Sequence, residues 1–339
     1  MSETNKSFIT EFVIVGFPGL DPHYYSMVSA LLFIVYLAIL AGNTAFLVVF
    51  ATEQGLHKPM YFIILNLVLS DILFSTTTLP KIIAKYWFKA GTISFTGCFV
   101  QMFFVHYFGS ANSFILLIMS IDRYVAICFP LRYPVIIKNS NVLILSITAW
   151  LVASTGCLMT VIRAYPLPYC SSNTIIHCFC DHISITTLAC TDRTPYAIPA
   201  LISAMVVLLV PLAFIIFSYL SIIVAVLRIS STKARVKTFS TCSGQLTIIA
   251  LYYIPRIFVY MSSSVFGIKF NTDLRLTIIL LYSLSPPMLN PLIYFLRTEE
   301  IKKILITRLS LIDFYDYMNC PTHWPCSVNK HSHCDFFSV

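Results

Sequence analysis

Four charged side chains lie within or beside long apolar stretches. In such surroundings they can form ion pairs or bind ions. Asp71 lies within one stretch, the Asp122-Arg123 pair directly follows another, and Arg256 lies in a third. An unpaired charge costs roughly 3 kcal/mol or more inside a bilayer. If these stretches cross a membrane, Asp122 and Arg123 must lie at its edge, Asp71 must face other helices, and Arg256 needs a partner.

Cysteine chemistry is the second candidate. One long segment between apolar stretches holds Cys170, Cys178, Cys180 and Cys190. If that segment is an oxidising outer loop, disulfides are expected, and with Cys98 the set numbers five, so one thiol is left over. Zinc is the alternative, but Cys178-x-Cys180 does not have the usual spacing of zinc ligands.

Catalytic patterns are missing from the sequence. It contains no His-Glu-x-x-His, no Gly-x-Ser-x-Gly and no P-loop. An intramembrane enzyme would need a convergent nucleophile, metal or carboxylate set. We therefore expect no catalytic residue, no enzyme activity and no cofactor.

The apolar stretches are the elements that must position these groups. Apolar residue types make up 58% of the 339 residues, and only 11% are charged. A soluble domain could not hide that much apolar surface, so a bilayer is the expected solvent. Seven stretches can cross about 30 Å of hydrocarbon as helices: residues 27–50, 59–79, 99–121, 142–162, 196–227, 239–261 and 274–296.

Positive charge indicates the orientation of these spans. With the N-terminus outside, 13 of the 22 Lys and Arg residues lie in cytoplasmic segments: Lys58, Arg123, Arg132, Lys138, Arg228, Lys233, Arg235, Lys237, Arg297, Lys302, Lys303, Arg308 and Lys330. The net charge of +8 then favours anionic membrane lipid and a partner protein, since no basic-aromatic nucleic-acid module is present.

The N-terminal end agrees with this orientation. No cleavable signal pattern precedes the first span, so that span is expected to act as an uncleaved anchor. Asn5-Lys6-Ser7 is a glycosylation sequon, and Asn5 is usable only on the lumenal side.

One run identifies a family resemblance. Residues 119–134 read Met-Ser-Ile-Asp-Arg-Tyr-Val-Ala-Ile-Cys-Phe-Pro-Leu-Arg-Tyr-Pro, which resembles the rhodopsin-like G-protein-coupled receptors and, among them, the odorant receptors. Residues 56–62, 92–98, 237–242 and 286–297 resemble the same receptors, in the same order. The resemblance covers about residues 8–310.

The resemblance implies an all-α fold, a seven-transmembrane helix bundle with an extracellular N-terminus. We expect an extracellular segment (1–26), the transmembrane domain (27–296), a short amphipathic membrane-surface helix (297–309) and a disordered cytoplasmic tail (310–339). Metal binding or palmitoylation is the alternative for the tail, whose candidate residues are Cys320, His323, Cys326, His331, His333 and Cys334.

The resemblance also implies functional residues. It pairs Cys98 with Cys180 and Cys170 with Cys190, so that the loop becomes a lid and Cys178 stays free. It assigns G-protein coupling and activation to Asp122, Arg123, Tyr124, Tyr219, Lys237, Asn290, Pro291 and Tyr294. Arg123 is expected to pair with Asp122 at rest and to exchange it on activation for Tyr219, Tyr294 and the G protein.

A ligand site is predicted from helical spacing together with the resemblance. Residues 106, 109, 110 and 113 share one face of the third span, beneath the expected lid. The predicted ligand-binding residues are His106, Gly109, Ser110, Ser113, His182, Ser203, Val207, Arg256 and Tyr260. Arg256 could await a carboxylate-bearing ligand or pair with Tyr260; alternatively, backbone carbonyls and water satisfy it.

The sequence departs from the family in two places. Many odorant receptors have Glu where this chain has Asn112, which weakens any cation site at Asp71. Asp71 is therefore either a packing carboxylate or a weak sodium site, and no other metal site is expected. Where many of these receptors have Phe-Tyr-Gly, this chain has Tyr252-Tyr253-Ile254-Pro255.

The implied function is that of an odorant receptor in the plasma membrane, in sensory cilia of olfactory neurons. It would bind a small-molecule odorant and activate a stimulatory, olfactory-type heterotrimeric G protein, raising cyclic AMP. Membrane lipid and a second copy of the chain are further candidate partners. A transporter or channel is the rival, but the repeated halves common in transporters are not found.

Overall fold

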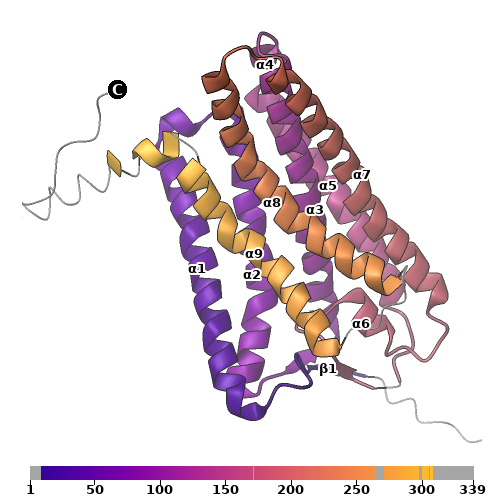
Figure 1. Cartoon of the computed structure of the whole chain (residues 1–339). Helices are drawn as coiled ribbons and strands as arrows, with labels where there is room; N and C mark the ends of the chain where they lie inside the picture. The colour runs from indigo at the N-terminus through magenta and orange to yellow at the C-terminus, as the bar shows by residue number, and fades with distance from the viewer. Residues whose placement is uncertain (1–8, 171, 265–270, 298–299, 305, 308–339) are drawn as a thin grey trace, which may run out of the picture.

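The computed structural model describes residues 9–170, 172–264, 271–297, 300–304 and 306–307. Within them, seven helices are long and apolar enough to cross a membrane, and they form one bundle (Figure 1). They are α1 (Tyr25–Thr52), α2 (Pro59–Phe88), α3 (Phe95–Cys128), α5 (Asn139–Ala164), α7 (Thr194–Leu227), α8 (Thr232–Ser264) and α9 (Thr272–Arg297). The connections contain four short helices, η1 (Pro22–Tyr24), η2 (Gln54–Leu56), α4 (Tyr133–Ile136) and α6 (His182–Thr186). The predicted seven-helix architecture is confirmed.

Several helices run past the predicted ends, and α2 shows why. Its apolar stretch ends near residue 79, but the helix continues through Lys81 and Lys85 to Phe88. The Lys81 ammonium donates a hydrogen bond to the backbone oxygen of Thr92. The Lys85 ammonium lies 3.8 Å from the centroid of the Tyr86 ring. Contacts of this kind stabilise a charged helix turn that hydropathy alone does not recognise.

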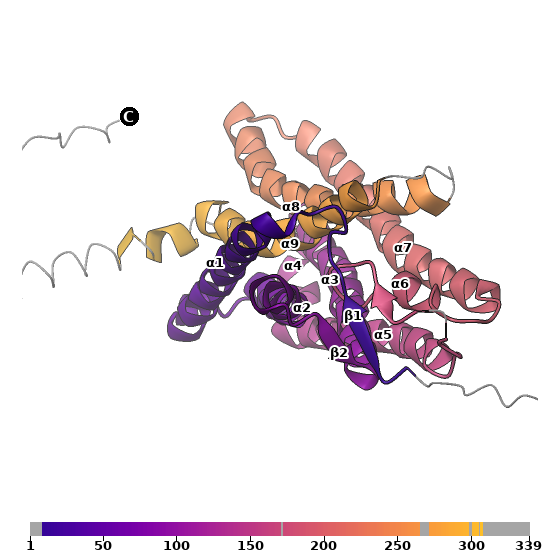
Figure 2. The same ribbon diagram turned by 90° about the horizontal axis from the view of Figure 1, so that it is seen from below.

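A small sheet, which the sequence analysis did not predict, closes one end of the bundle. Strand β1 (Glu11–Ile14) lies between β2 (Thr92–Ser94), antiparallel to it, and β3 (Thr174–Ile175), parallel to it. In Figure 2, which views the molecule from this end, β1 and β2 lie beside each other next to α2 and α3. Phe12 and Ile14 are fully buried, so the strand also packs into the bundle.

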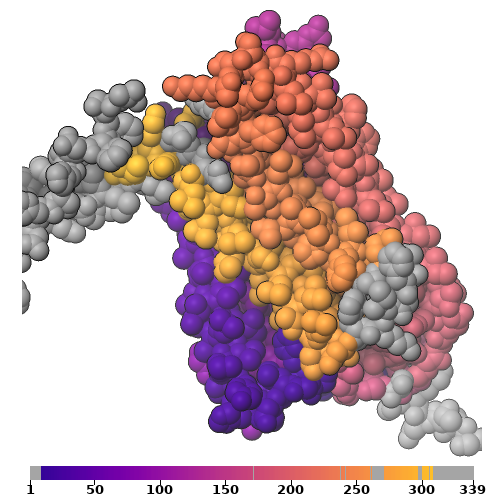
Figure 3. All heavy atoms as spheres, in the orientation of Figure 1, coloured from indigo at the N-terminus to yellow at the C-terminus, as the bar shows by residue number. Residues whose placement is uncertain are grey.

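Helix α3 is central to the bundle. It packs against α2, α5 and α7, while α8 and α9 pack side by side on the face seen in Figure 3. On the outside of α7, Phe214, Phe217 and Leu220 are each more than half exposed. Apolar side chains exposed in this way fit a surface solvated by lipid.

Polar side chains within the spans point inward, as predicted for Asp71. Asn43 and Asp71 have no exposed surface, and Asn43 donates a hydrogen bond of 2.9 Å to the Pro287 carbonyl. The two Asp71 oxygens accept hydrogen bonds from Asn290 at 2.7 Å and from Asn112 at 3.5 Å. Each carboxylate oxygen of Asp71 is therefore held by one amide donor, while sodium binding at Asp71 stays a prediction.

Candidate ligand-binding and activation sites

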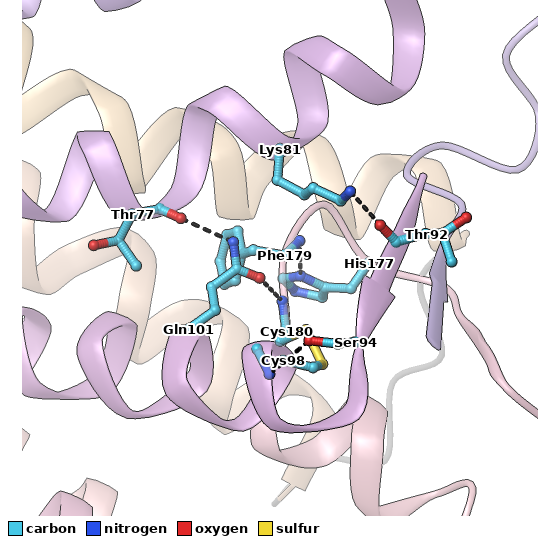
Figure 4. Close-up of a disulfide and its surroundings, with 10 residues drawn as sticks. Thr77, Lys81, Thr92, Ser94, Cys98, Gln101, His177, Phe179 and Cys180 are labelled. Carbon is cyan, nitrogen blue, oxygen red and sulfur yellow. Dashed lines mark hydrogen bonds between the residues drawn. A yellow bond between two sulfur atoms is a disulfide. The ribbon is translucent and has the colours of Figure 1, made fainter. Parts of the chain in front are cut away.

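Two disulfides fix the long loop over one end of the bundle. Cys98 of α3 is bonded to Cys180, and Cys170 is bonded to Cys190, as the resemblance implied. Gln101, one turn below Cys98, strengthens the first anchor (Figure 4). Its amide donates to the Thr77 carbonyl at 2.8 Å, and its oxygen accepts from the Cys180 backbone at 3.0 Å.

Cys178 is the free cysteine of this lid. Its side chain is 1% exposed, and burial raises the pKa of the thiol to about 12. Such a thiol is protonated at neutral pH and reacts slowly, so Cys178 behaves as a small packing residue.

A cavity of about 360 Å³ lies among α3, α5, α7, α8, α9 and the lid. Its size is within the range of small-molecule sites. Seven of the predicted residues line it: His106, Gly109, Ser110, His182, Ser203, Val207 and Arg256. The side chain of Tyr260 lies outside the part of the chain that the structure describes.

Ser113 does not line the cavity, so its prediction as a lining residue is wrong. It has the spacing of the other α3 residues but is fully buried beneath them. Its hydroxyl donates to the Val207 carbonyl and pairs with the Tyr253 hydroxyl, at 2.8 and 2.7 Å. The neighbouring Tyr252 hydroxyl donates to the Gly109 carbonyl. These contacts close the cavity and join α3 to α7 and α8.

Four charged or polar lining residues were not predicted from the sequence. Arg275 and Tyr282 line the cavity from α9, seven residues apart and therefore on one helix face. That spacing could have identified them, but α9 was interpreted only at its Asn290-Pro291 end. Asp181 and Arg193, from the lid and the start of α7, were also missed.

Asp181 is the acidic lining residue of the described cavity. Its Oδ1 lies 3.5 Å from His106 Nε2, and its Oδ2 accepts from the Ile183 backbone at 3.1 Å. Burial alone would raise the pKa of Asp181, but the nearby His177, His106, His182 and Arg275 outweigh burial and lower it. The carboxylate is therefore ionised and already has partners.

His182 follows Asp181 in the lid. Burial and the charge of His106 lower its pKa to about 4, against the opposing effect of Asp181. His182 is therefore a neutral hydrogen-bonding group at physiological pH.

Comparison with known proteins identifies the family. The family model described as olfactory receptor matches residues 32–311. Human Olfactory receptor 2AT4 is 38% identical over 299 residues, covering 88% of this chain and 92% of the human protein. The chain belongs to the olfactory receptor family. Rat Olfactory receptor 1f45 is 37% identical over 305 residues, covering 90% of this chain and 96% of its own.

The fold agrees with that family. The crystal structure of squid rhodopsin superposes with a TM-score of 0.69 at 16% identity, covering 94% of this chain and 92% of the rhodopsin chain. The olfactory receptor described here is a multi-pass protein of the plasma membrane and not an enzyme.

The receptor's Asp122-Arg123 pair lies at the end of the bundle away from the lid. Arg123 Nε is 3.7 Å from Asp122 Oδ2, and Tyr133 donates to Asp122 Oδ1 at 2.8 Å. Arg123 Nε is buried and has no hydrogen-bond partner among the described residues. The ion pair is therefore long, and Asp122 is shared between Arg123 and Tyr133.

Two tyrosines assigned to activation are buried at the same end. Tyr219 donates to Gln245 Oε1 at 3.1 Å. The Tyr294 hydroxyl is buried and has no partner within the described chain. Neither hydroxyl is hydrogen-bonded to Arg123 in the described part of the structure, and the roles of both tyrosines in activation stay predictions. Tyr124 is partly exposed on α3, and the side chain of Lys237 lies outside the described part of the receptor.

A second contact at this end joins the start of α2 to the segment after α9. Glu300 accepts from the Lys58 ammonium and from the Tyr61 hydroxyl, each at 2.7 Å. Partial burial alone would raise the pKa of Glu300, but these hydrogen bonds and the charges of Lys58 and Lys303 hold it below its usual value. The contact is therefore formed at neutral pH and is lost as the pH falls through that lowered pKa.

We expect Tyr61→Phe to destabilise the receptor more than Lys58→Gln. Tyr61 is 1% exposed, and its hydrogen bond to a charged group should contribute about 1.5 kcal/mol or more. The Lys58 side chain is 57% exposed, and exposed ion pairs contribute about 0–1 kcal/mol. Thermal unfolding of the receptor in detergent measures both. A larger loss for Lys58→Gln would show that the ion pair dominates.

Proposed function

We propose that this receptor binds a small odorant in the cavity beneath the lid and activates a stimulatory, olfactory-type heterotrimeric G protein, raising cyclic AMP. The single observation that carries the proposal is the connection between the two ends of α3. The same helix lines the cavity with His106, Gly109 and Ser110 and ends in the Asp122-Arg123 pair.

The contact between α3 and α8 is the expected relay. Tyr252 and Tyr253 hydrogen-bond α3 at Gly109 and Ser113. A ligand that displaces Tyr252 would move α8 relative to α3, and α8 carries Gln245, the partner of Tyr219, toward the other end. A shift of this packed pair can transmit a small displacement between the two sites.

The orientation and the remaining segments belong to the same proposal. The N-terminal segment, with its sequon at Asn5, faces outside, and the tail faces the cytoplasm; Asn5 and the tail from residue 310 on lie outside the described residues. After α9, Ile301 is buried while Lys302 and Lys303 are exposed, which supports an amphipathic helix at the membrane surface. Sensory cilia of olfactory neurons are the proposed location, and dimerisation is a further possibility for experiment.

A cyclic-AMP assay in cells with and without the stimulatory G-protein α-subunit tests this proposal. A panel of odorants should include at least one that raises cyclic AMP, and deletion of the α-subunit should abolish the response. A ligand-gated current that persists without any G protein would instead support the channel alternative.

A further inference from the structure

Arg256 is held in the cavity by aromatic rings and one backbone carbonyl. Its guanidinium carbon lies 3.9 Å from the centroid of the Tyr252 ring and 4.7 Å from that of Tyr282. Its Nη1 donates to the Tyr252 carbonyl at 2.9 Å. The ion pairs found among the described residues are Lys58–Glu300, His106–Asp181 and Arg123–Asp122. The Arg256 guanidinium is in none of them, so no described carboxylate lies within 4.0 Å of its nitrogens.

This arrangement positions the charge without neutralising it. A guanidinium has five N–H donors, and one of them donates a hydrogen bond to a group in the described part of the chain. Stacking on two tyrosine rings restricts the orientation of the guanidinium and stabilises its positive charge. The remaining donors belong to a side chain that lines the cavity. They form a rigid fork of the kind that binds carboxylates in a bidentate manner.

Arg275 adds a second positive charge to the same cavity. It lines the cavity from α9, and its Nε is buried without a hydrogen-bond partner among the described residues. Asp181 cannot neutralise both arginines, because its oxygens already contact His106 and the backbone of the lid. With Arg193 also in the lining, three arginines face one ionised carboxylate.

We propose that the cavity is selective for small organic carboxylates, with the ligand's carboxylate on Arg256 and its hydrocarbon body on apolar lining residues such as Val207, Leu208 and Ile279. This inference rests on the proposed odorant function and specifies its ligand class. The carboxylate supplies the negative charge that balances the arginines. The apolar body supplies binding energy as water leaves its surface.

The same contact links binding to activation. Tyr252 carries Arg256 on its ring and donates its hydroxyl to the Gly109 carbonyl of α3. An anion that draws Arg256 toward the ligand therefore changes the packing of Tyr252 and, through it, the contact between α8 and α3. A neutral ligand of the same shape lacks this pull.

Matched ligand sets test the proposal. A panel of straight-chain, branched and aromatic carboxylic acids is compared with the primary amides and alcohols of the same carbon skeletons, by cyclic-AMP potency and by thermal stabilisation of the purified receptor. We expect the best acid to exceed its amide and alcohol in potency by about tenfold or more, the usual scale for hydrogen bonds between charged groups. Equal potency within each matched set would overturn the proposal.

Variants assign the effect to Arg256. Arg256→Gln should remove the preference for the acid, Arg256→Lys should restore part of it, and Arg163→Gln, an exposed arginine of α5 that does not line the cavity, should leave it unchanged. Unchanged acid potency in Arg256→Gln at normal surface level would make Arg256 structural. If the variant does not reach the surface, the matched thermal stabilisation of the unmodified receptor decides.

The two proposals fail in different ways. If neutral odorants raise cyclic AMP and no acid does so or stabilises the receptor, the carboxylate proposal is wrong while the odorant function stands. If acids stabilise the purified receptor but no compound raises cyclic AMP, the ligand class stands and the coupling proposal is wrong.

Discussion

Arg123→Ala should reduce agonist-stimulated cyclic AMP to less than about a tenth of the unmodified response at equal surface level, because it removes the group that we expect to change partners on activation. In the structure, Arg123 lies 3.7 Å from Asp122, which also accepts a hydrogen bond from Tyr133. Replacement by alanine removes both the resting contact and the proposed contacts to Tyr219, Tyr294 and the G protein. Cyclic AMP normalised to surface receptor, measured by flow cytometry, gives the result.

Arg132→Ala is the matched control for this prediction. Arg132 lies nine residues further along the chain, is exposed and caps the short helix α4 without a side-chain hydrogen bond. It should retain most of the response. A retained response in Arg123→Ala would reduce the role of Arg123 to orienting the helix in the membrane.

Cys98→Ser and Cys180→Ser should each abolish surface expression, and the double variant should be little worse than either single variant. Each single substitution breaks the same bond, so the two effects are not additive. A disulfide of this kind contributes about 2–4 kcal/mol, a large part of the stability of a folded domain. Surface labelling and thermal unfolding of the solubilised receptor measure the loss.

Cys178→Ser is the control for the disulfide. Cys178 is two residues from Cys180 and equally buried, but it is not bonded to another cysteine. Its substitution should leave most of the surface expression. Additive losses in the Cys98 and Cys180 variants, or a bridge between Cys98 and Cys178 in mass mapping of the native protein, would contradict the pairing seen in the structure.

The sequence was sufficient for the membrane architecture because hydropathy reports the solvent of each helix. It underestimated helix ends where charged residues such as Lys81 and Lys85 continue a helix beyond the apolar stretch through tertiary contacts. The sheet was missed because β1 is four residues long and its partner strands begin at residues 92 and 174, a pairing that local pattern does not encode.

Helical spacing identified the cavity face of α3 but not the depth at which the cavity ends. Ser113 shares that face but lies beyond the inner end of the cavity, because Tyr253 fills the space beside it. The groups that contact Arg256 also depend on tertiary structure. Tyr282, on a different helix and 26 residues along the chain, supplies the second ring that no local spacing could reveal.

Gly109→Leu tests the central claim, that the cavity is the ligand site, most directly. A Cβ added at Gly109 meets no atom within 4 Å, so a side chain can begin at this position without displacing the backbone, and leucine is also a better helix former than glycine. Gly55→Leu, at a position equally open but in η2 at the far end, is the matched control. The measurement is cyclic AMP over a full agonist titration at matched surface level. The proposed function predicts a potency loss of about tenfold or more for Gly109→Leu and none for Gly55→Leu. Full potency in Gly109→Leu would place the ligand elsewhere and contradict the account.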